Sequence, residues 1–253
     1  MNQVKRDSVY FLADFHLGVP NKKASLEREK KIVRFLESIK DDAKQIYLLG
    51  DIFDLWFEYK YVVPKGYVRL LGKLAELTDN GVKIDFFCGN HDFWQKDYFE
   101  KELNIKIHKE SSKIIVLDGK RFMIGHGDGL DKSDFKYKFI DFMFKNWASI
   151  KFISLCPTNW FMSVGNSWSK KSRKSHKAID LIDLKEKEPI YVYCKKVLEK
   201  EDIDYFVFGH RHIVCDITLN NKARYINVGD WVNDCCYAKW NNEELIVKRF
   251  EKE

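Results

Sequence analysis

The sequence predicts an α/β fold with a mixed sheet or two packed sheets. Short apolar runs of strand length alternate with helical patterns in the first part of the chain, which indicates parallel strands. Asp118-Gly119 lies between two such runs, as in a hairpin, and turn residues recur at Asn220-Asn221 and Asn241-Asn242. Because hairpins join antiparallel strands, parallel and antiparallel pairs should occur together.

Six runs rich in β-forming residues are the predicted strands. They span residues 8–13, 45–49, 83–87, 113–116, 121–124 and 204–208. Two helical faces lie between the first three runs, and the second ends at Asn80-Gly81. Their apolar residues are Ile32, Phe35, Leu36 and Ile39 in the first face, and Val68, Leu71, Leu74, Ala75 and Leu77 in the second.

Composition narrows the class of protein and its compartment. With 253 residues and 45% apolar content, the chain can bury one large core. The six cysteines form no C-x-x-C pair, which favours a reducing, cytoplasmic environment. The first apolar run, residues 9–13, is too brief for a secretory leader, and no run approaches the roughly 20 residues that span a bilayer. We therefore expect neither a leader nor a transmembrane helix.

The positive charge is concentrated in one segment. Residues 142–179 contain seven lysines and arginines and no acidic residue, which exceeds the net charge of +6 for the whole chain. This segment belongs to a longer stretch, residues 131–189, in which aromatic residues recur at helix-like spacing. We predict a core formed by residues 1–130 and 190–253, a helical insertion or cap at 131–189, and an anionic partner bound by the insertion.

Five short motifs carry metal-ligating side chains, and all but one directly follow a predicted strand. The loops at the carboxyl ends of strands build the sites of α/β proteins, so these distant motifs should converge. The motifs are Asp14-Phe15-His16, Gly50-Asp51-Ile52-Phe53-Asp54, Gly89-Asn90-His91-Asp92, Gly125-His126-Gly127-Asp128 and Gly209-His210-Arg211-His212.

The chemistry of these side chains predicts two divalent metal ions. Imidazole, carboxylate and amide oxygen are borderline to hard ligands, and no motif contains the cysteine typical of structural zinc sites or iron-sulfur clusters. Two ions bridged by a carboxylate suit hydrolysis at phosphorus. A single motif is equally consistent with a turn or a solvated histidine; Asp54 is consistent with a helix cap and Asp128 with a turn. Five motifs together favour the metal site.

In this order, the five motifs resemble those of the calcineurin-like metallophosphoesterases. The resemblance implies an αββα sandwich of two sheets. It implies that Asp14, His16 and His212 hold one metal ion. It also implies that Asn90, His126 and His210 hold the other and that Asp51 bridges the two. His91 is then a catalytic residue that orients or protonates the phosphate or leaving group, with Asp92 as its partner.

Within that superfamily, the chain most resembles the UDP-2,3-diacylglucosamine pyrophosphatases of lipid A synthesis. Residues 13–18, the run YLLGDIFDLW at 47–56, the His126-Gly127-Asp128 motif and the position of the insertion carry the resemblance. It implies hydrolysis of the acylated UDP-sugar to UMP and lipid X, manganese as the metal, and peripheral association with the cytoplasmic face of an anionic inner membrane. The implied substrate contacts are Asn90, His91, Ser169, Arg173, Lys174, Lys177 and His210.

Other functions share some of these features. A related phosphoesterase could act on another nucleotide or a phosphoprotein, and the basic segment would also suit a nuclease, although we expect no nucleic-acid partner. A non-catalytic module on this scaffold should lack some ligands, and none is missing. One departure is His91, where the best-known branch of the pyrophosphatases has arginine; a histidine could act directly as an acid. The sequence predicts no oligomeric state.

Overall fold

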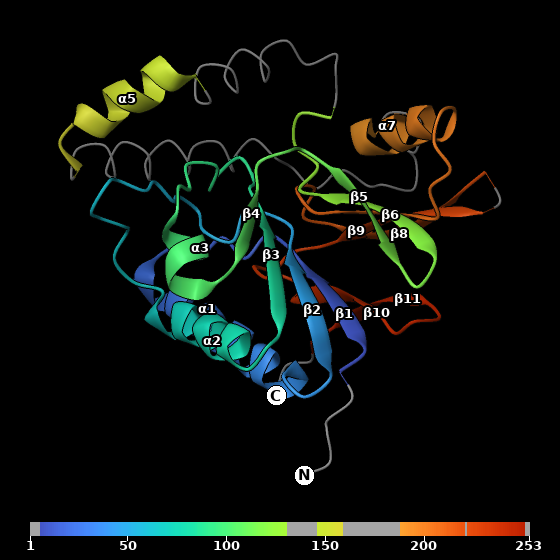
Figure 1. Cartoon of the computed structure of the whole chain (residues 1–253), viewed down its shortest axis with the longest axis horizontal. Coiled ribbons are helices and arrows are strands. Elements are labelled where there is room, and N and C mark those ends of the chain that lie inside the picture. The colour runs from blue at the N-terminus through green and yellow to red at the C-terminus, as the bar shows by residue number, and fades with distance from the viewer. Residues whose placement is uncertain (1–5, 131–145, 159–187, 221, 251–253) are drawn as a thin grey trace.

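The computed structural model describes residues 6–130, 146–158, 188–220 and 222–250. Two sheets pack face to face and helices cover their outer faces, which gives four layers in the order αββα (Figure 1). The two-sheet α/β fold is confirmed.

The first sheet is six-stranded and mixed. Its strands, in spatial order, are β11 (Leu245–Arg249), β10 (Cys236–Trp240), β1 (Ser8–Leu12), β2 (Ala43–Leu48), β3 (Lys83–Phe87) and β4 (Lys106–His108). From β1 to β4 the strands run parallel, whereas β10 pairs antiparallel with both β1 and β11. The parallel strands therefore end at one common edge.

The second sheet has five strands. In spatial order they are β5 (Lys113–Leu117), β6 (Lys120–Gly125), β7 (Tyr205–Phe208), β9 (Ala223–Val228) and β8 (Val214–Leu219). The central strands β6, β7 and β9 are parallel, and β5 and β8 pair antiparallel at the two edges. The hairpins β5–β6, β8–β9 and β10–β11 turn where the sequence predicts turns.

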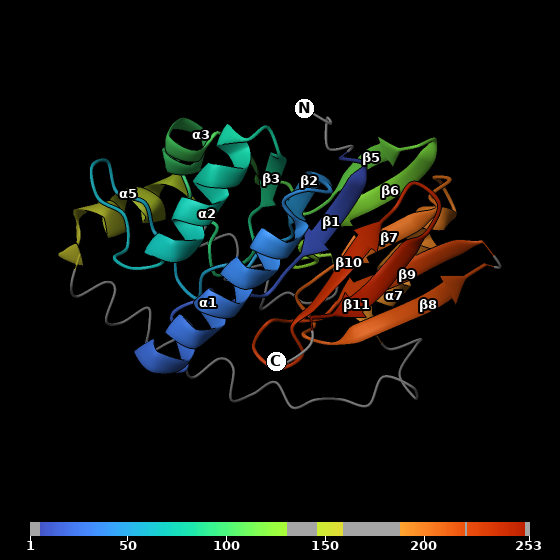
Figure 2. The ribbon, with the colours of Figure 1, turned by 90° about the horizontal axis from the view of Figure 1, so that it is seen from below.

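Three layers of apolar packing hold the sandwich together. The central layer lies between the sheets, where Phe11 of β1 stacks on Phe122 of β6 with ring centroids 6.0 Å apart. The helices α1 (Lys22–Ile39) and α2 (Val68–Asp79) bury apolar faces against the first sheet (Figure 2). Helix α7 (Pro189–Leu198) buries Ile190 and Cys194 against the second. Removing these faces from water is the main stabilising contribution.

Most expected elements form, and three others are additional. The six predicted strands and both helices lie within one or two residues of their expected ends, except that α1 begins at Lys22, ten residues before its first marked apolar residue, Ile32. Helix α3 (Tyr98–Leu103), helix α7 and the three-residue β4 have no counterpart in the sequence prediction. Within 131–189, the structure describes α5 (Trp147–Leu155), and the division into core and cap stays a prediction. In the described part of the chain, no helix is both long and apolar enough to cross a bilayer.

Candidate metal centre

The five motifs converge at the carboxyl ends of the strands. The motifs at Asp14, Asp51 and Asn90 follow β1, β2 and β3, and those at His126 and His210 follow β6 and β7. A hydrogen bond joins the two groups of loops, because the backbone N–H of His210 donates to Oδ2 of Asp14 at 2.8 Å. Residues almost two hundred positions apart therefore form one site.

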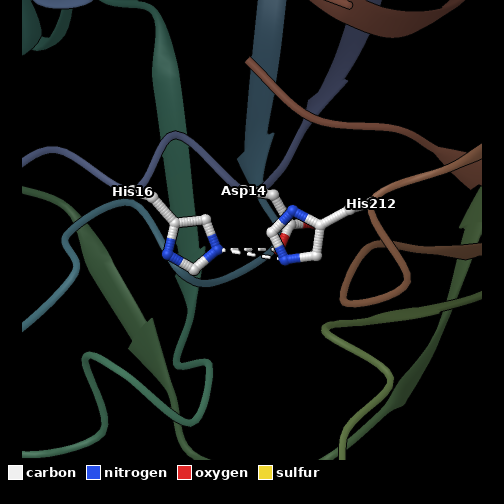
Figure 3. Close-up of side chains that lie close together, drawn as sticks. All are labelled: Asp14, His16 and His212. Atoms are coloured by element: carbon white, nitrogen blue, oxygen red, sulfur yellow. Dashed lines mark hydrogen bonds and ion pairs between the residues drawn. The ribbon is translucent and has the colours of Figure 1, made fainter. Parts of the chain in front are cut away.

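Asp14, His16 and His212 form the first cluster (Figure 3). The Nε2 atoms of the two histidines are 3.2 Å apart, and they lie 3.6 Å and 3.5 Å from Oδ1 of Asp14. Asp14 and His16 are buried, while the His212 side chain is about one third exposed. The three side chains present one oxygen and two nitrogens to a common point.

Asp51, His126 and His210 form the second cluster. Oδ2 of Asp51 lies 3.3 Å from Nε2 of His126 and 3.7 Å from Nε2 of His16, which belongs to the first cluster. One carboxylate oxygen thus lies between the two groups, the position that a bridging ligand requires. Asn90 follows β3 in the same loop as His91, whose backbone N–H donates to Oδ1 of Asp51 at 2.9 Å.

Three of the expected ligand atoms are buried without a hydrogen-bond partner in the described part of the chain. These atoms are Oδ1 of Asp14, Oδ1 of Asn90 and Nε2 of His126. Burying a polar atom unpaired costs about 1–3 kcal/mol, and a bound ligand would offset that cost. Because Asp14 belongs to the first cluster and His126 to the second, the unpaired atoms fit a pair of metal ions.

The charges of the site also favour cations. Burial by itself lowers the pKa of His16, but the nearby carboxylates of Asp14, Asp54 and Asp51 raise that pKa to about 10. Burial likewise opposes protonation of His126, yet Asp51 holds its pKa well above the ordinary value. In contrast, burial and the charge of His126 lower the pKa of His210 to about 4. Without metal, the negative carboxylates stabilise the protonated form of neighbouring histidines. Divalent ions at the same place would be stabilised by the same negative charges.

Each of three ligand histidines has its other ring nitrogen near an oxygen. Nδ1 of His126 is 2.8 Å from the carbonyl oxygen of Leu49. Nδ1 of His16 lies 3.4 Å from Oδ1 of Asp54, and Nδ1 of His212 lies 3.3 Å from Oδ2 of Asp230. Such contacts fix the tautomer and the ring direction, so that Nε2 faces the metal position.

The backbone of the ligand loops is unusual. Five of the seven expected ligands have positive φ angles. They are Asp14 (56°), His16 (43°), Asp51 (53°), His210 (68°) and His212 (53°). Non-glycine residues adopt this left-handed conformation rarely, and it clusters at functional sites where the surroundings impose it. The sharp turns direct side chains from the strand ends toward one another.

Two of the motif glycines are required by close approach. A Cβ atom at Gly89 would lie 2.2 Å from Oδ1 of Asp51, and one at Gly209 would lie 2.6 Å from Oδ2 of Asp14. Both distances are far below van der Waals contact. Any side chain at these positions would displace an expected ligand.

His91 and Asp92 have different surroundings from those expected. We expected Asp92 to pair with His91, but Nδ1 of His91 lies 2.8 Å from the carbonyl oxygen of Asp54. Asp92 is fully buried, and its carboxylate accepts the backbone N–H groups of Asp51, Ile52, Phe53 and Gly89. Asp92 therefore fixes the turn that carries Asp51. Adjacency in sequence was misleading because neighbouring side chains on a turn point apart.

The sequence reasoning missed the orienting roles of Asp54 and Asp230. Instead of capping a helix, Asp54 supplies a carboxylate oxygen to His16 and a carbonyl oxygen to His91. Asp230 follows Gly229 directly after β9, the same strand-glycine-aspartate pattern that marks Asp51 after β2. That pattern could have identified Asp230.

The expected substrate contacts divide into two groups. Asn90, His91 and His210 lie in the loops of the metal centre. Ser169, Arg173, Lys174 and Lys177 lie outside the described residues, so their contacts stay predictions.

Comparison with known proteins identifies the family. The model of the calcineurin-like phosphoesterase family matches residues 8–214. A UDP-2,3-diacylglucosamine hydrolase from Porphyromonas gingivalis is 34% identical and covers 97% of this chain and 98% of its own. A protein of the same name from Haemophilus ducreyi is 26% identical, with 89% of this chain and 92% of the relative covered. Among solved structures, a novel archaeal phosphodiesterase is 10% identical and covers 96% of this chain and 99% of its own, with a TM-score of 0.46.

The family match covers all five motifs and strands of both sheets, from β1 to β7, and the relative from Porphyromonas gingivalis aligns over almost the entire chain. The predicted resemblance to the calcineurin-like phosphoesterases is confirmed. The chain therefore belongs to the calcineurin-like phosphoesterase family and is a hydrolase of that family.

Proposed function

We propose that this hydrolase cleaves the pyrophosphate of UDP-2,3-diacylglucosamine, releasing UMP and lipid X. The observation that carries the proposal is the alignment of nearly the whole chain with a UDP-2,3-diacylglucosamine hydrolase at 34% identity. The convergent clusters around Asp51 supply a site for the hydrolysis. A phosphoesterase for another nucleotide, a nucleic acid or a phosphoprotein is the alternative.

In this proposal, the site holds two divalent ions. Asp14, His16 and His212 would hold one ion, Asn90, His126 and His210 would hold the other, and Asp51 lies between His16 and His126. Such a pair of ions activates a water molecule and neutralises charge on the phosphate. We propose Mn²⁺ as the metal, although the same ligand types accept several divalent ions.

His91 would orient the phosphate and supply a proton to the leaving group. Its Nδ1 faces the carbonyl oxygen of Asp54 at 2.8 Å and therefore carries a proton that it donates there. Nε2 is then the nitrogen available for the substrate, and it donates when the ring is protonated. The backbone contact of His91 with Asp51 keeps this ring beside the metal positions. Asp92 contributes by holding the turn of Asp51.

Lipid recognition is assigned to the insertion at 131–189. Its aromatic content suits an apolar slot for two acyl chains, and Ser169, Arg173, Lys174 and Lys177 would bind the diphosphate. The described portion, α5, carries apolar residues on more than one face. Ile150 and Ile153 pack against the buried cluster that includes Phe57 and Trp94. One side of α5 is thereby fixed to the core.

We also propose peripheral association with an anionic membrane surface on the cytoplasmic side. Trp147, Phe152 and Leu155 of α5 are 73%, 68% and 77% exposed. Nζ of Lys151 lies 4.9 Å from the centroid of the Trp147 ring, so positive charge borders the apolar surface. Exposed aromatic and apolar side chains with adjacent lysines suit the interface of an anionic bilayer.

The substrate assay is direct. Chelator-treated protein, reloaded with Mn²⁺ and given UDP-2,3-diacylglucosamine, should release UMP, as measured by chromatography. Reloading with Mg²⁺, Zn²⁺ or Co²⁺ in parallel tests the metal, and Mn²⁺ should give the highest turnover. The substrate assignment is wrong if no UMP appears while a cyclic or linear nucleotide is hydrolysed well.

A further inference from the structure

Arg28 of α1 is a buried arginine directed at the backbone of a ligand loop. Its side chain is only 8% exposed, whereas arginines are seldom buried without a specific partner. Nη2 donates to the carbonyl oxygen of His16 at 3.0 Å and also to that of Val19. One guanidinium nitrogen thus joins both ends of the turn that follows the Asp14-Phe15-His16 motif.

Arg28 binds the carbonyl oxygen of His16, an expected metal ligand whose backbone adopts the left-handed conformation. His16 has a φ angle of 43°, and its Nε2 must lie close to both Asp14 and His212. The N–H of His16 donates to the carbonyl oxygen of Asp51 at 2.9 Å. With Arg28 on its carbonyl oxygen, His16 is fixed on both sides, so rotation of its backbone would break a hydrogen bond in either direction.

The rest of the turn is anchored to α1 and to the residue that precedes α2. The N–H of Gly18 donates to Oγ of Ser25 in α1 at 2.8 Å, and Oη of Tyr67, the residue before α2, donates to the carbonyl oxygen of Leu17 at 3.2 Å. Ser25 also lies on the buried face of α1. These neutral bonds each hold one group, whereas Arg28 holds two carbonyls at once with a charged donor, and charge-assisted hydrogen bonds are the stronger kind.

We propose that Arg28 is a positioning residue of the metal centre, which sets the direction of the His16 imidazole through the His16 and Val19 carbonyl groups. The inference rests on the metal-dependent hydrolysis proposed above. Arg28 does not reach the reacting atoms, so its effect should be on metal affinity and kcat, with little effect on KM. Partners that orient metal ligands typically change metal affinity or activity by about 10–100-fold.

The test compares three variants of the full-length protein. Arg28→Met keeps an unbranched apolar stem and removes the guanidinium group with the hydrogen bonds to the His16 and Val19 carbonyl groups. Arg28→Lys keeps a positive charge that can hold one carbonyl group. Arg34→Met is the matched control, because Arg34 is an exposed arginine on the same helix. Mn²⁺ affinity by titration calorimetry, the melting temperature of the chelated protein, and kcat and KM are measured for each.

We expect Arg28→Met to lower Mn²⁺ affinity and kcat roughly 10-fold or more with KM nearly unchanged, Arg28→Lys to be intermediate, and Arg34→Met to match the unaltered protein. Wild-type Mn²⁺ affinity in Arg28→Met, with only a lower melting temperature, would show that Arg28 is merely structural and overturn the inference. If Arg28→Met does not fold, Arg28→Lys decides by the same criterion. If the unaltered protein binds Mn²⁺ but releases no UMP, the substrate proposal fails while the affinity comparison still tests Arg28.

Discussion

Oδ2 of Asp230 lies 3.3 Å from Nδ1 of His212, which joins the loop after β9 to the ligand loop after β7. Asp230 is fully buried, and its carboxylate also accepts the backbone N–H of Asn233 at 2.7 Å. Burial raises its pKa, but the hydrogen bonds with His212 and Asn233 outweigh burial and leave the pKa lowered. Asp230 therefore stays negatively charged beside the ring of His212, an expected ligand whose side chain is about one third exposed.

Replacing Asp230 should weaken metal binding without removing a ligand. Asp230→Asn removes the charge that orients the His212 ring, and we expect Mn²⁺ affinity to fall about 10-fold or more. Titration calorimetry measures the affinity. Asp216→Asn is the control, because Asp216 forms an ion pair with Arg224 on the surface of the second sheet. Equal affinities in the two variants would contradict the orienting role.

Asp51→Asn should reduce turnover by at least about 100-fold while the fold is retained. The amide replaces the carboxylate oxygen that lies between His16 and His126, so the bridging charge is lost. Circular dichroism checks the fold, and UMP release and bound metal check the site. Asp41→Asn, at an exposed position in the loop before β2, is the matched substitution. Near-full activity of Asp51→Asn with metal bound would refute the two-metal assignment.

The contribution of Asp85 to stability should depend on pH. Oδ1 of Asp85 lies 2.6 Å from Nε2 of the buried His108, and Oδ2 accepts a hydrogen bond from Gln45 at 2.7 Å. Burial raises the pKa of Asp85, but these partners outweigh it, so the pKa is lowered. A carboxyl group with a lowered pKa in the folded state stabilises the protein above its ordinary pKa of 3.8, and that contribution is lost as the pH falls through the lowered value.

Asp85→Asn should therefore cost about 1.5–3 kcal/mol of the free energy of unfolding at pH 7, and the difference from the unaltered protein should shrink below pH ~4. Urea unfolding of the chelator-treated, metal-free proteins at pH 7 and at pH 3 measures the difference in the free energy of unfolding. Asp202→Asn, an exposed surface change, should have no effect at either pH. A difference for Asp85→Asn that is the same at pH 7 and at pH 3 would contradict the prediction.

Helix α5 should determine binding to vesicles. Replacing Trp147 and Phe152 by serine removes two exposed apolar side chains, and we expect sedimentation with phosphatidylglycerol vesicles to drop severalfold. Val116→Ser is the control, because Val116 is 64% exposed on β5 in the second sheet, away from α5 in sequence. Added salt should weaken the remaining binding by screening the lysines. Unchanged sedimentation of the double variant would exclude α5 as the membrane contact.

The sequence predicted those features that depend on short, periodic patterns. The strand runs, the helical faces of α1 and α2 and the hairpin at Asp118-Gly119 each lie within one local segment, and all formed. The convergence of the five motifs followed from their place after strands. The three-residue β4 and the six-residue α3 were missed because elements this short contain too few residues to show a period. Helix α7 was missed as well; it begins at Pro189, the predicted boundary between insertion and core.

The orienting groups were harder to predict, because their roles depend on contacts between distant segments. Asp230 acts on His212 only because β7 and β9 pair side by side, which no local pattern reveals. Asp54 and Asp92 were assigned by sequence proximity, and both assignments were wrong: the carbonyl oxygen of Asp54 contacts His91, while the Asp92 carboxylate holds the turn of Asp51. In the sequence, Arg28 resembles a surface residue of a lysine-rich helix. In the structure it is buried against the ligand loop.

The left-handed backbone of five expected ligands has a consequence for mutagenesis. Aspartate, asparagine and histidine are among the non-glycine residues that tolerate this conformation best, and alanine is not. A ligand changed to alanine would therefore lose a donor atom and also disfavour its own loop, so an alanine scan would overstate the importance of each ligand for the metal. Asparagine at Asp14, His16 or Asp51 retains the backbone preference. Asparagine substitutions are thus the cleaner way to separate chemistry from folding in this enzyme.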